Sequence, residues 1–85
     1  MKNYIKDALK IDELNYDLQN ISSSDNKEVE EYTQKEVIDE AEYVLSCFYE
    51  GGHSLNEDLN SENKKIKEEA EKQTKQLKKY IDKYK

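Results

Sequence analysis

Apolar residues in the first quarter of the chain recur at steps of three and four, the spacing of one face of an α-helix. They are Tyr4, Ala8, Ile11, Leu14, Leu18 and Ile21. This stripe predicts a helix over residues 3–22. The polar run at residues 22–26 should end it, because Ser, Asp and Asn side chains compete with the backbone for hydrogen bonds.

A second stripe predicts a helix over residues 26–50. Asp25 and Glu28 have the spacing of a capping box, in which the two side chains satisfy backbone N–H groups at a helix start. The apolar positions that follow are Val29, Tyr32, Val37, Ile38, Ala41, Val44, Leu45, Cys47, Phe48 and Tyr49. Gly51 and Gly52 come next and predict the end of this helix, since glycine readily takes the left-handed conformation that closes one.

The third predicted helix covers residues 54–84. Ser54 and Glu57 repeat the capping-box spacing. The apolar side carries Leu55, Leu59, Ile66, Ala70, Gln73, Leu77, Tyr80 and Tyr84, with Ile81 adjacent. Asn60 and Ser61 mark a point at which this helix can break. If it is continuous, the first two helices cannot cover it, so its last turns should project or pair with another copy.

Composition fits this pattern. The chain has 85 residues, no proline, two glycines and 40% charged residues, which favours helix over sheet. A hydrophobic content of 34% suffices for one thin core. We therefore expect one all-α domain over residues 1–85: a small three-helix bundle, antiparallel in chain order, with a long, lysine-rich C-terminal helix.

The junction between the second and third predicted helices raises the question of chemistry. Glu50, His53 and Glu57 could be drawn as a metal site, but Gly51 and Gly52 interrupt the helix that would align the ligands. Cys47 and His53 could be drawn as nucleophile and base, yet no third group is placed to orient the histidine. We expect a buried Cys47, no catalytic residue, no metal site and no cofactor.

The chain contains no run of about 18 consecutive apolar residues, and its start lacks the pattern of a secretion signal. A single cysteine cannot close an internal disulfide. These features predict a cytoplasmic protein without a membrane partner.

Charge is distributed unevenly along the chain. Residues 1–60 carry 15 Asp or Glu and 5 Lys, a net charge of −10, whereas residues 61–85 carry 5 acids and 9 lysines, a net charge of +4. In the second predicted helix four acids have helical spacing and predict an outward ridge: Glu28, Glu31, Asp39 and Glu42. The first helix adds Asp12, Glu13 and Asp17. This acidity can simply solvate the bundle, or it can meet a positive groove on a partner by imitating nucleic-acid phosphates.

The lysines of the third predicted helix suggest the opposite partner, a nucleic acid. Acidic residues are interleaved with them, however, and the chain contains no arginine, which is preferred for bidentate base and phosphate contacts. Direct nucleic-acid binding is therefore disfavoured. We expect these lysines to complement the helix dipole and to lie against the two acidic helices.

Seven tyrosines in 85 residues is a high number. Tyr4, Tyr32, Tyr80 and Tyr84 fall on or beside the apolar stripes and are expected in the core or at its edge. The other three fit the stripes less well and are our candidate partner contacts, because a tyrosine adds apolar area at low entropic cost. These are Tyr16, Tyr43 and Tyr49.

In size, in its Lys, Asn, Glu, Asp and Tyr content and in the acidic run DNKEVEEYTQKEVIDEAE at residues 25–42, the chain resembles small acidic inhibitor proteins of phages and mobile elements, of the anti-CRISPR type. The resemblance includes no family motif, so no site residue transfers. It implies a protein that binds a CRISPR nuclease or a similar nucleic-acid-binding host protein.

Two other classes remain open. The chain can be a helical assembly or adaptor protein that forms a coiled-coil homodimer through its third helix, with Ile66, Ala70, Leu77, Tyr80 and Tyr84 as the interface. It can also be a small regulator that binds nucleic acid through its lysine-rich C-terminal helix.

Overall fold

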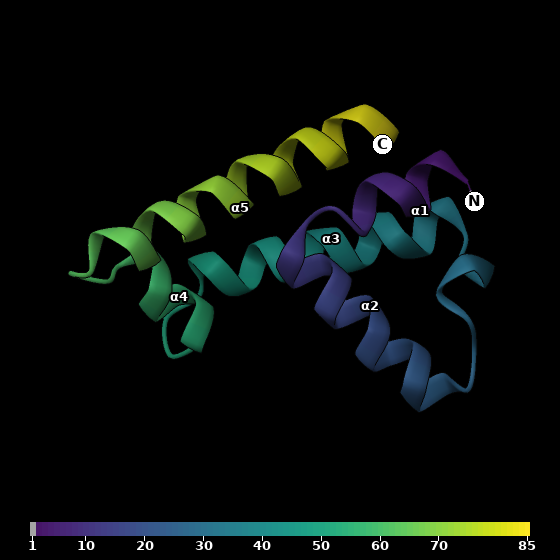
Figure 1. Cartoon of the computed structure of the whole chain (residues 1–85), viewed down its shortest axis with the longest axis horizontal. Helices are drawn as coiled ribbons and strands as arrows, with labels where there is room; N and C mark the ends of the chain where they lie inside the picture. Colours follow the sequence, from purple (N-terminus) through teal and green to yellow (C-terminus); the bar gives the residue numbers. More distant parts are fainter. Residues whose placement is uncertain (1) are drawn as a thin grey trace.

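The structure is a computed structural model that describes residues 2–85, and within them it is built of helices without strands. The elements in chain order are α1 (Asn3–Ala8), α2 (Asp12–Asp25), the 3₁₀-helix η1 (Val29–Glu31), α3 (Gln34–Tyr49), α4 (Ser54–Leu59) and α5 (Lys64–Tyr84). In Figure 1, α3 and α5 lie side by side and run in opposite directions, while α2 crosses α3 obliquely. The prediction of a small all-α bundle is confirmed.

The predicted first helix, over residues 3–22, is wrong in detail because the chain breaks at residues 9–11 and then continues as a helix to Asp25. Ile11 has an extended backbone (φ −97°, ψ 111°) and is buried. No side chain of this segment caps the new helix start. Instead, the backbone N–H of Glu13 donates to Oε1 of Gln73, in α5, at 2.9 Å. A contact between residues 60 positions apart therefore stabilises the start of α2.

The predicted second helix, over residues 26–50, is also too long. Asn26 closes α2 in the left-handed conformation (φ 51°), and α3 begins only at Gln34. The capping box is formed by Thr33 and Glu36, not by Asp25 and Glu28. The spacing Thr33-x-x-Glu36 was present in the sequence, and it prevails because residues 26–32 form a turn and η1 before it.

The predicted third helix, over residues 54–84, is two helices separated by residues 60–63. His53, rather than Ser54, caps α4 by accepting from the N–H of Leu55 at 3.2 Å. Asn63 caps α5 by accepting from the N–H groups of its first turn. The expected glycine turn before α4 is present, with Gly52 at φ 85°.

All helices contribute to one core. Its largest fully buried side chains are Phe48, Ile5, Leu14, Leu18, Leu77 and Val37. Cys47 is buried, as predicted, and so are Tyr32 and Tyr80, while Tyr4 and Tyr84 pack at the core edge.

The last turns of α5 pack against α1, so the expectation that they project from the bundle is wrong. The hydroxyl of Tyr80 donates to the backbone carbonyl of Tyr4 at 2.7 Å. Asp7 accepts from the hydroxyl of Tyr84 and pairs with Lys83 Nζ at 2.8 Å.

Across residues 2–85, no helix has the length and apolar character needed to cross a membrane.

Candidate functional site

The acidic residues are concentrated in the segment from α2 to the residue after α3. Residues 12–50, called the acidic segment below, contain 12 Asp or Glu and 2 Lys, a net charge of −10. The predicted ridge of Glu28, Glu31, Asp39 and Glu42 is not one helix face, because the first two residues lie at and in η1 and the last two lie on α3. All four side chains are nevertheless exposed.

Few of these acids are neutralised within the chain. Among residues 2–85, the acidic segment forms two ion pairs with lysine: Glu36 with Lys27 at 3.6 Å and Glu42 with Lys85 at 3.2 Å. The lysines of α5 were expected to lie against the acidic helices. Of the lysines from residue 64 onwards, Lys83 and Lys85 pair with acids elsewhere in the chain, and both lie at its C-terminal end. The negative charge of the acidic segment therefore remains open to a partner.

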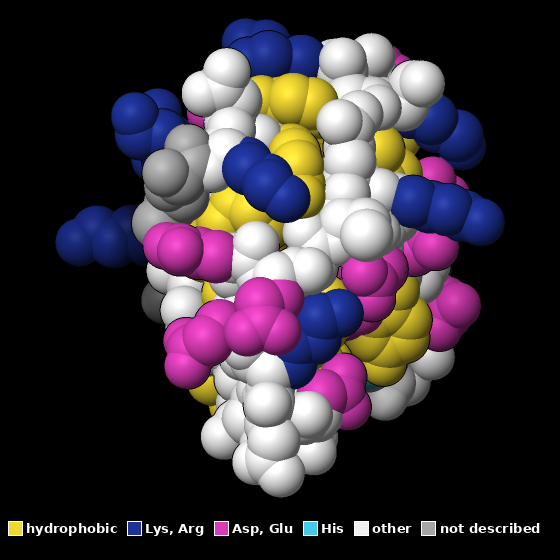
Figure 2. Space-filling model, turned by 90° about the vertical axis from the view of Figure 1, so that its right-hand side faces the viewer, with side chains coloured by type: hydrophobic (Ala, Val, Ile, Leu, Met, Phe, Trp, Pro, Cys, Tyr) yellow, Lys and Arg dark blue, Asp and Glu magenta, His cyan; other side chains and the backbone are white. Residues whose placement is uncertain are grey.

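Figure 2 shows the end of the molecule where η1 and the start of α3 lie. Carboxylates spread across the middle of this face, and most of the lysines lie above them. The acids that this region contributes from the α2–η1 connection are all exposed: Asp25, Glu28, Glu30 and Glu31. On this face, negative side chains are thus concentrated in the middle, with most of the positive ones above them.

Two of the predicted contact tyrosines flank a cleft between α2, α3 and the start of α4. Its volume is ≈ 240 Å³, below the range of about 300–1,000 Å³ that is typical for pockets holding drug-sized ligands. Tyr16 is 67% exposed and Tyr43 is 57% exposed. The residues that line it are Glu13, Tyr16, Asp17, Tyr43, Val44, Cys47, His53, Ser54 and Leu55, and this set is called the tyrosine cleft below.

The carboxylates of the tyrosine cleft lie in an unfavourable electrostatic environment. Partial burial raises the pKa of Glu13, and neighbouring acids raise it further; these are Asp58, Asp17 and Asp12. Oδ2 of Asp17 is buried, and no N–H group or hydroxyl of residues 2–85 donates a hydrogen bond to it. Neither Glu13 nor Asp17 forms an ion pair within residues 2–85. The cleft therefore holds two carboxylates that no lysine within residues 2–85 pairs with.

Beside the cleft, Asp17 meets Glu40 of α3. The pKa of Glu40 is raised to about 7, and burial of its carboxyl is the largest cause. A hydrogen bond to Asp17 and the negative charge of Asp17 raise it further. Two ionised carboxylates cannot donate to each other, so a proton held by Glu40 supplies the hydrogen bond.

This pair predicts that the free energy of unfolding falls as pH rises. The pKa of Glu40 is higher in the folded chain, so its stabilising contribution is complete below about pH 4.5 and is lost as pH rises through about 7. Because the site is partly open to solvent, we expect a loss on the order of 1–2 kcal/mol between pH 5 and pH 8. Urea unfolding followed by circular dichroism at several pH values measures it.

Glu40→Gln should flatten this dependence, since glutamine donates a hydrogen bond to Asp17 at every pH. Asp39→Asn is the matched control, because the neighbouring Asp39 is exposed. A Glu40→Gln variant that loses as much stability as wild type between pH 5 and pH 8 would contradict the role of the pair.

Cys47 and His53 lie in the same cleft wall but are not joined by a hydrogen bond in the described chain. Cys47 is 3% exposed, and its thiol is the largest cause of the raised pKa of the Tyr43 hydroxyl. Nδ1 of His53 is occupied by the N–H of Leu55. Among residues 2–85, no three His, Cys, Asp or Glu side chains come together as metal ligands, so the Glu50, His53 and Glu57 set does not converge.

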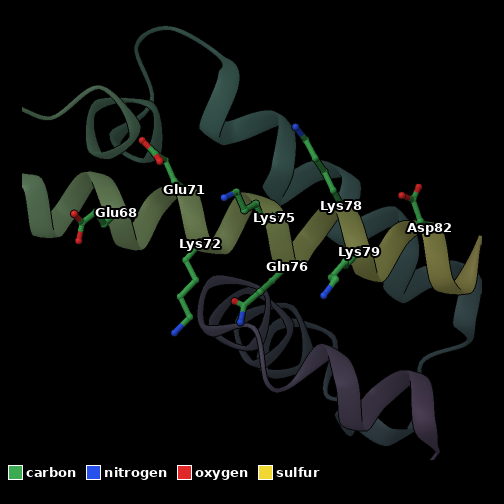
Figure 3. Close-up of a pocket in the computed structure, with 8 residues that line it drawn as sticks. All are labelled: Glu68, Glu71, Lys72, Lys75, Gln76, Lys78, Lys79 and Asp82. Atoms are coloured by element: carbon green, nitrogen blue, oxygen red, sulfur yellow. The ribbon is translucent and has the colours of Figure 1, made fainter.

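A second hollow, of ≈ 560 Å³, lies along the outside of α5. Figure 3 shows that all its labelled side chains come from this one helix: Lys72 and Lys79 point to one side, and Glu71 and Lys78 point to the other. Their heads diverge, so no group of atoms is positioned to hold a ligand. We therefore centre the candidate site on the acidic segment and its tyrosine cleft.

The sequence named four residues of the cleft separately, and the structure brings them together: Glu13, Tyr16, Asp17 and Tyr43. Asp12 and Tyr49 do not line the cleft. The Nζ atom of Lys78 lies over the ring of Tyr49, 5.3 Å from the ring centre. The predicted contact residues did not include Cys47 and His53, which also line the cleft, or Glu40, which lies beside it. The spacing of Glu40, Tyr43 and Cys47, three and then four residues, was the available signal that they share one side of a helix.

Comparison of the chain with models of known protein families, with curated proteins and with solved structures finds no match.

Proposed function

We propose that this chain is a non-enzymatic inhibitor that binds another protein and covers a positively charged, nucleic-acid-binding groove with its acidic segment. The observation that carries the proposal is the lack of internal neutralisation: 12 acids in residues 12–50 have two lysine partners within the described chain. Like charges held close together cost stability, so a complementary partner surface would relieve a cost that the fold itself leaves in place.

The shape of the acidic segment supports a protein partner. Its carboxylates are distributed over α2, η1 and α3, three elements fixed by one core. A positive groove that binds nucleic acid presents several cations at fixed spacing, and a rigid set of carboxylates can meet them without ordering first. The exposed Tyr16 and Tyr43 add apolar area next to these charges. A CRISPR nuclease is one protein with such a groove, in line with the resemblance noted above.

The coiled-coil alternative loses its interface in this fold. Ala70, Leu77 and Tyr80 are 3%, 0% and 4% exposed, because α5 packs them against the rest of the chain. A homodimer through this stripe would require the bundle to open. The nucleic-acid alternative keeps one supporting observation, because the lysines of α5 before Lys83 form no ion pair within residues 2–85.

One experiment tests the proposal and this alternative together. The full chain is immobilised and exposed to a nuclease-treated bacterial lysate, and the captured proteins are identified. A captured protein is then purified, and its binding is measured with increasing duplex DNA and with increasing salt. We expect the captured partner to bind nucleic acid, DNA to displace it, and affinity to fall with salt, since exposed charges are screened within about 10 Å at 0.1 M ionic strength.

Two results would reject the proposal. One is a partner that holds this chain and its own nucleic acid at the same time without loss of affinity. The other is salt-dependent binding of duplex DNA to this chain alone, which would support the lysine-rich regulator instead.

A further inference from the structure

We propose that a hollow at the junction of α4 and α5 is a docking site for a basic segment of the partner protein. This segment places one apolar side chain against Ile66 and positions lysine or arginine side chains beside it. The hollow has a volume of ≈ 430 Å³, lies between the start of α2, the end of α3, α4 and the start of α5, and is called the Ile66 hollow below. The inference deepens the proposed function and rests on it for the source of the segment.

Part of the lining of the Ile66 hollow is apolar. Phe48 and Ala70 line it and are buried. Ile66 is 43% exposed, and among the large exposed hydrophobic residues of the described chain it is the one aliphatic side chain. It lies on an apolar stripe of the sequence, but the break at residues 60–63 ends the preceding helix before it, and it stays open to solvent. An apolar side chain inserted here would remove this surface from water.

The charged side chains around this apolar part are mostly acidic. Glu13, Asp58 and Glu69 line the hollow from α2, α4 and α5, and Lys65 is the one cation among its lining residues. None of these four groups forms an ion pair within residues 2–85. Partial burial raises the pKa of Glu13, and the negative charge of Asp58 raises it further. Three acids and one lysine give the lining a net charge of −2, which favours a cationic occupant.

The position of the hollow favours a segment of the same partner. Glu13 and Phe48 belong to the acidic segment, so the hollow continues the surface that the proposed function assigns to the partner. In Figure 1, α4 and the start of α5 lie at one end of the molecule and both termini lie at the other. A second contact at this end would fix the orientation of the partner, which net charge alone does not do. A second copy of this chain is disfavoured as the occupant, because its net charge is −6.

Short peptides test the hollow without the partner. The ¹⁵N-labelled full chain is titrated with the capped tripeptide lysine–leucine–lysine, and amide shifts are followed by NMR. Two control peptides separate the contacts: lysine–serine–lysine lacks the apolar side chain, and glutamate–leucine–glutamate reverses the charge. We expect saturable shifts in residues 12–14, 47–49, 57–59 and 65–70, with half-saturation on the order of 1 mM. The serine peptide should bind about tenfold more weakly, and the glutamate peptide should not saturate.

Variants locate the site. Ile66→Ser should weaken binding of the lysine–leucine–lysine peptide about tenfold, and Asp58→Asn combined with Glu69→Gln about fivefold. The matched controls change an exposed tyrosine and two exposed acids outside the hollow: Tyr49→Ser, and Glu68→Gln combined with Glu71→Gln. Both controls should stay within about twofold of wild type. Circular dichroism checks that each variant keeps its helical content.

Three peptide results would overturn the proposal: equal binding of the leucine and serine peptides, shifts spread over exposed acids with no saturation, or equal losses in the hollow and control variants. Dimerisation that Ile66→Ser abolishes, measured by sedimentation equilibrium, would assign the hollow to a second copy and would overturn it too. The two proposals can fail separately. Peptide binding without any captured nucleic-acid-binding protein would retain the hollow and reject the inhibitor function. Capture of such a protein without peptide binding would do the reverse.

Discussion

Neutralising Glu28, Glu30, Glu31 and Asp39 together is expected to weaken partner binding about a hundredfold while the helical content stays unchanged. All four side chains are exposed and form no ion pair within the described chain. Glutamine and asparagine keep the side-chain volume and polarity but remove four negative charges. At roughly 0.7 kcal/mol for each exposed charge pair lost with the partner, the total corresponds to about two orders of magnitude in Kd.

The matched control neutralises four exposed acids of α5 instead: Glu68, Glu69, Glu71 and Asp82. Both variants change the net charge from −6 by the same amount, so general charge attraction affects them equally. Kd is measured by calorimetry at low salt, with circular dichroism as the check on folding. We expect the α5 variant to stay within about threefold of wild type. Equal losses would show that only net charge matters, and unchanged binding of the first variant would reject the acidic segment as the contact surface.

Phe48→Ala is expected to lower the free energy of unfolding by about 3–5 kcal/mol, the largest stability effect of any single substitution proposed for this chain. Phe48 is 1% exposed and is among the largest fully buried side chains. It lies at the end of α3, where the core continues beneath α4 and α5, and its carbonyl accepts from Asn56 Nδ2 at 2.8 Å. A domain of this size is stabilised by only about 4–13 kcal/mol, so the variant should be partly unfolded at 37 °C.

The adjacent residue gives the control, because Tyr49 is 52% exposed. Tyr49→Ala should cost less than about 1 kcal/mol, mainly through loss of the contact with Lys78. Urea unfolding followed by circular dichroism compares the two variants with wild type. Similar costs for both substitutions would mean that the end of α3 is not packed as the structure shows.

The sequence by itself determined the helical class, most residues of the core and the exposed tyrosines, although Ile5 was missed and Ile66, on a predicted stripe, is 43% exposed. Stripes at steps of three and four identify the buried side of a helix because burial follows the helical period, whatever the helix packs against. Leu14, Val37 and Leu77 all lie on predicted stripes and are 0% exposed. By the same reasoning Tyr16, Tyr43 and Tyr49 were assigned to the surface, and all three are more than half exposed.

Helix boundaries depended on competing local signals and on distant contacts. Two spacings, Asp25-x-x-Glu28 and Thr33-x-x-Glu36, both fit a capping box, and the left-handed turn at Asn26 decides between them. The break before α2 has no glycine or proline to mark it. The helix start that follows this break is stabilised by Gln73, whose side chain accepts from the N–H of Glu13, 60 residues away in the sequence.

The tertiary structure alone decided which acids act together. Glu28 and Asp39 appeared to share one helix face, but η1 and the extended residues 32–33 lie between them. Asp17 and Glu40 come together because α2 crosses α3, which brings two carboxyl groups 23 positions apart into one partly buried site and raises the pKa of one of them. Periodicity assigns a side chain to a side of its own helix. It contains no information on the angle at which two helices cross, and that angle forms the tyrosine cleft.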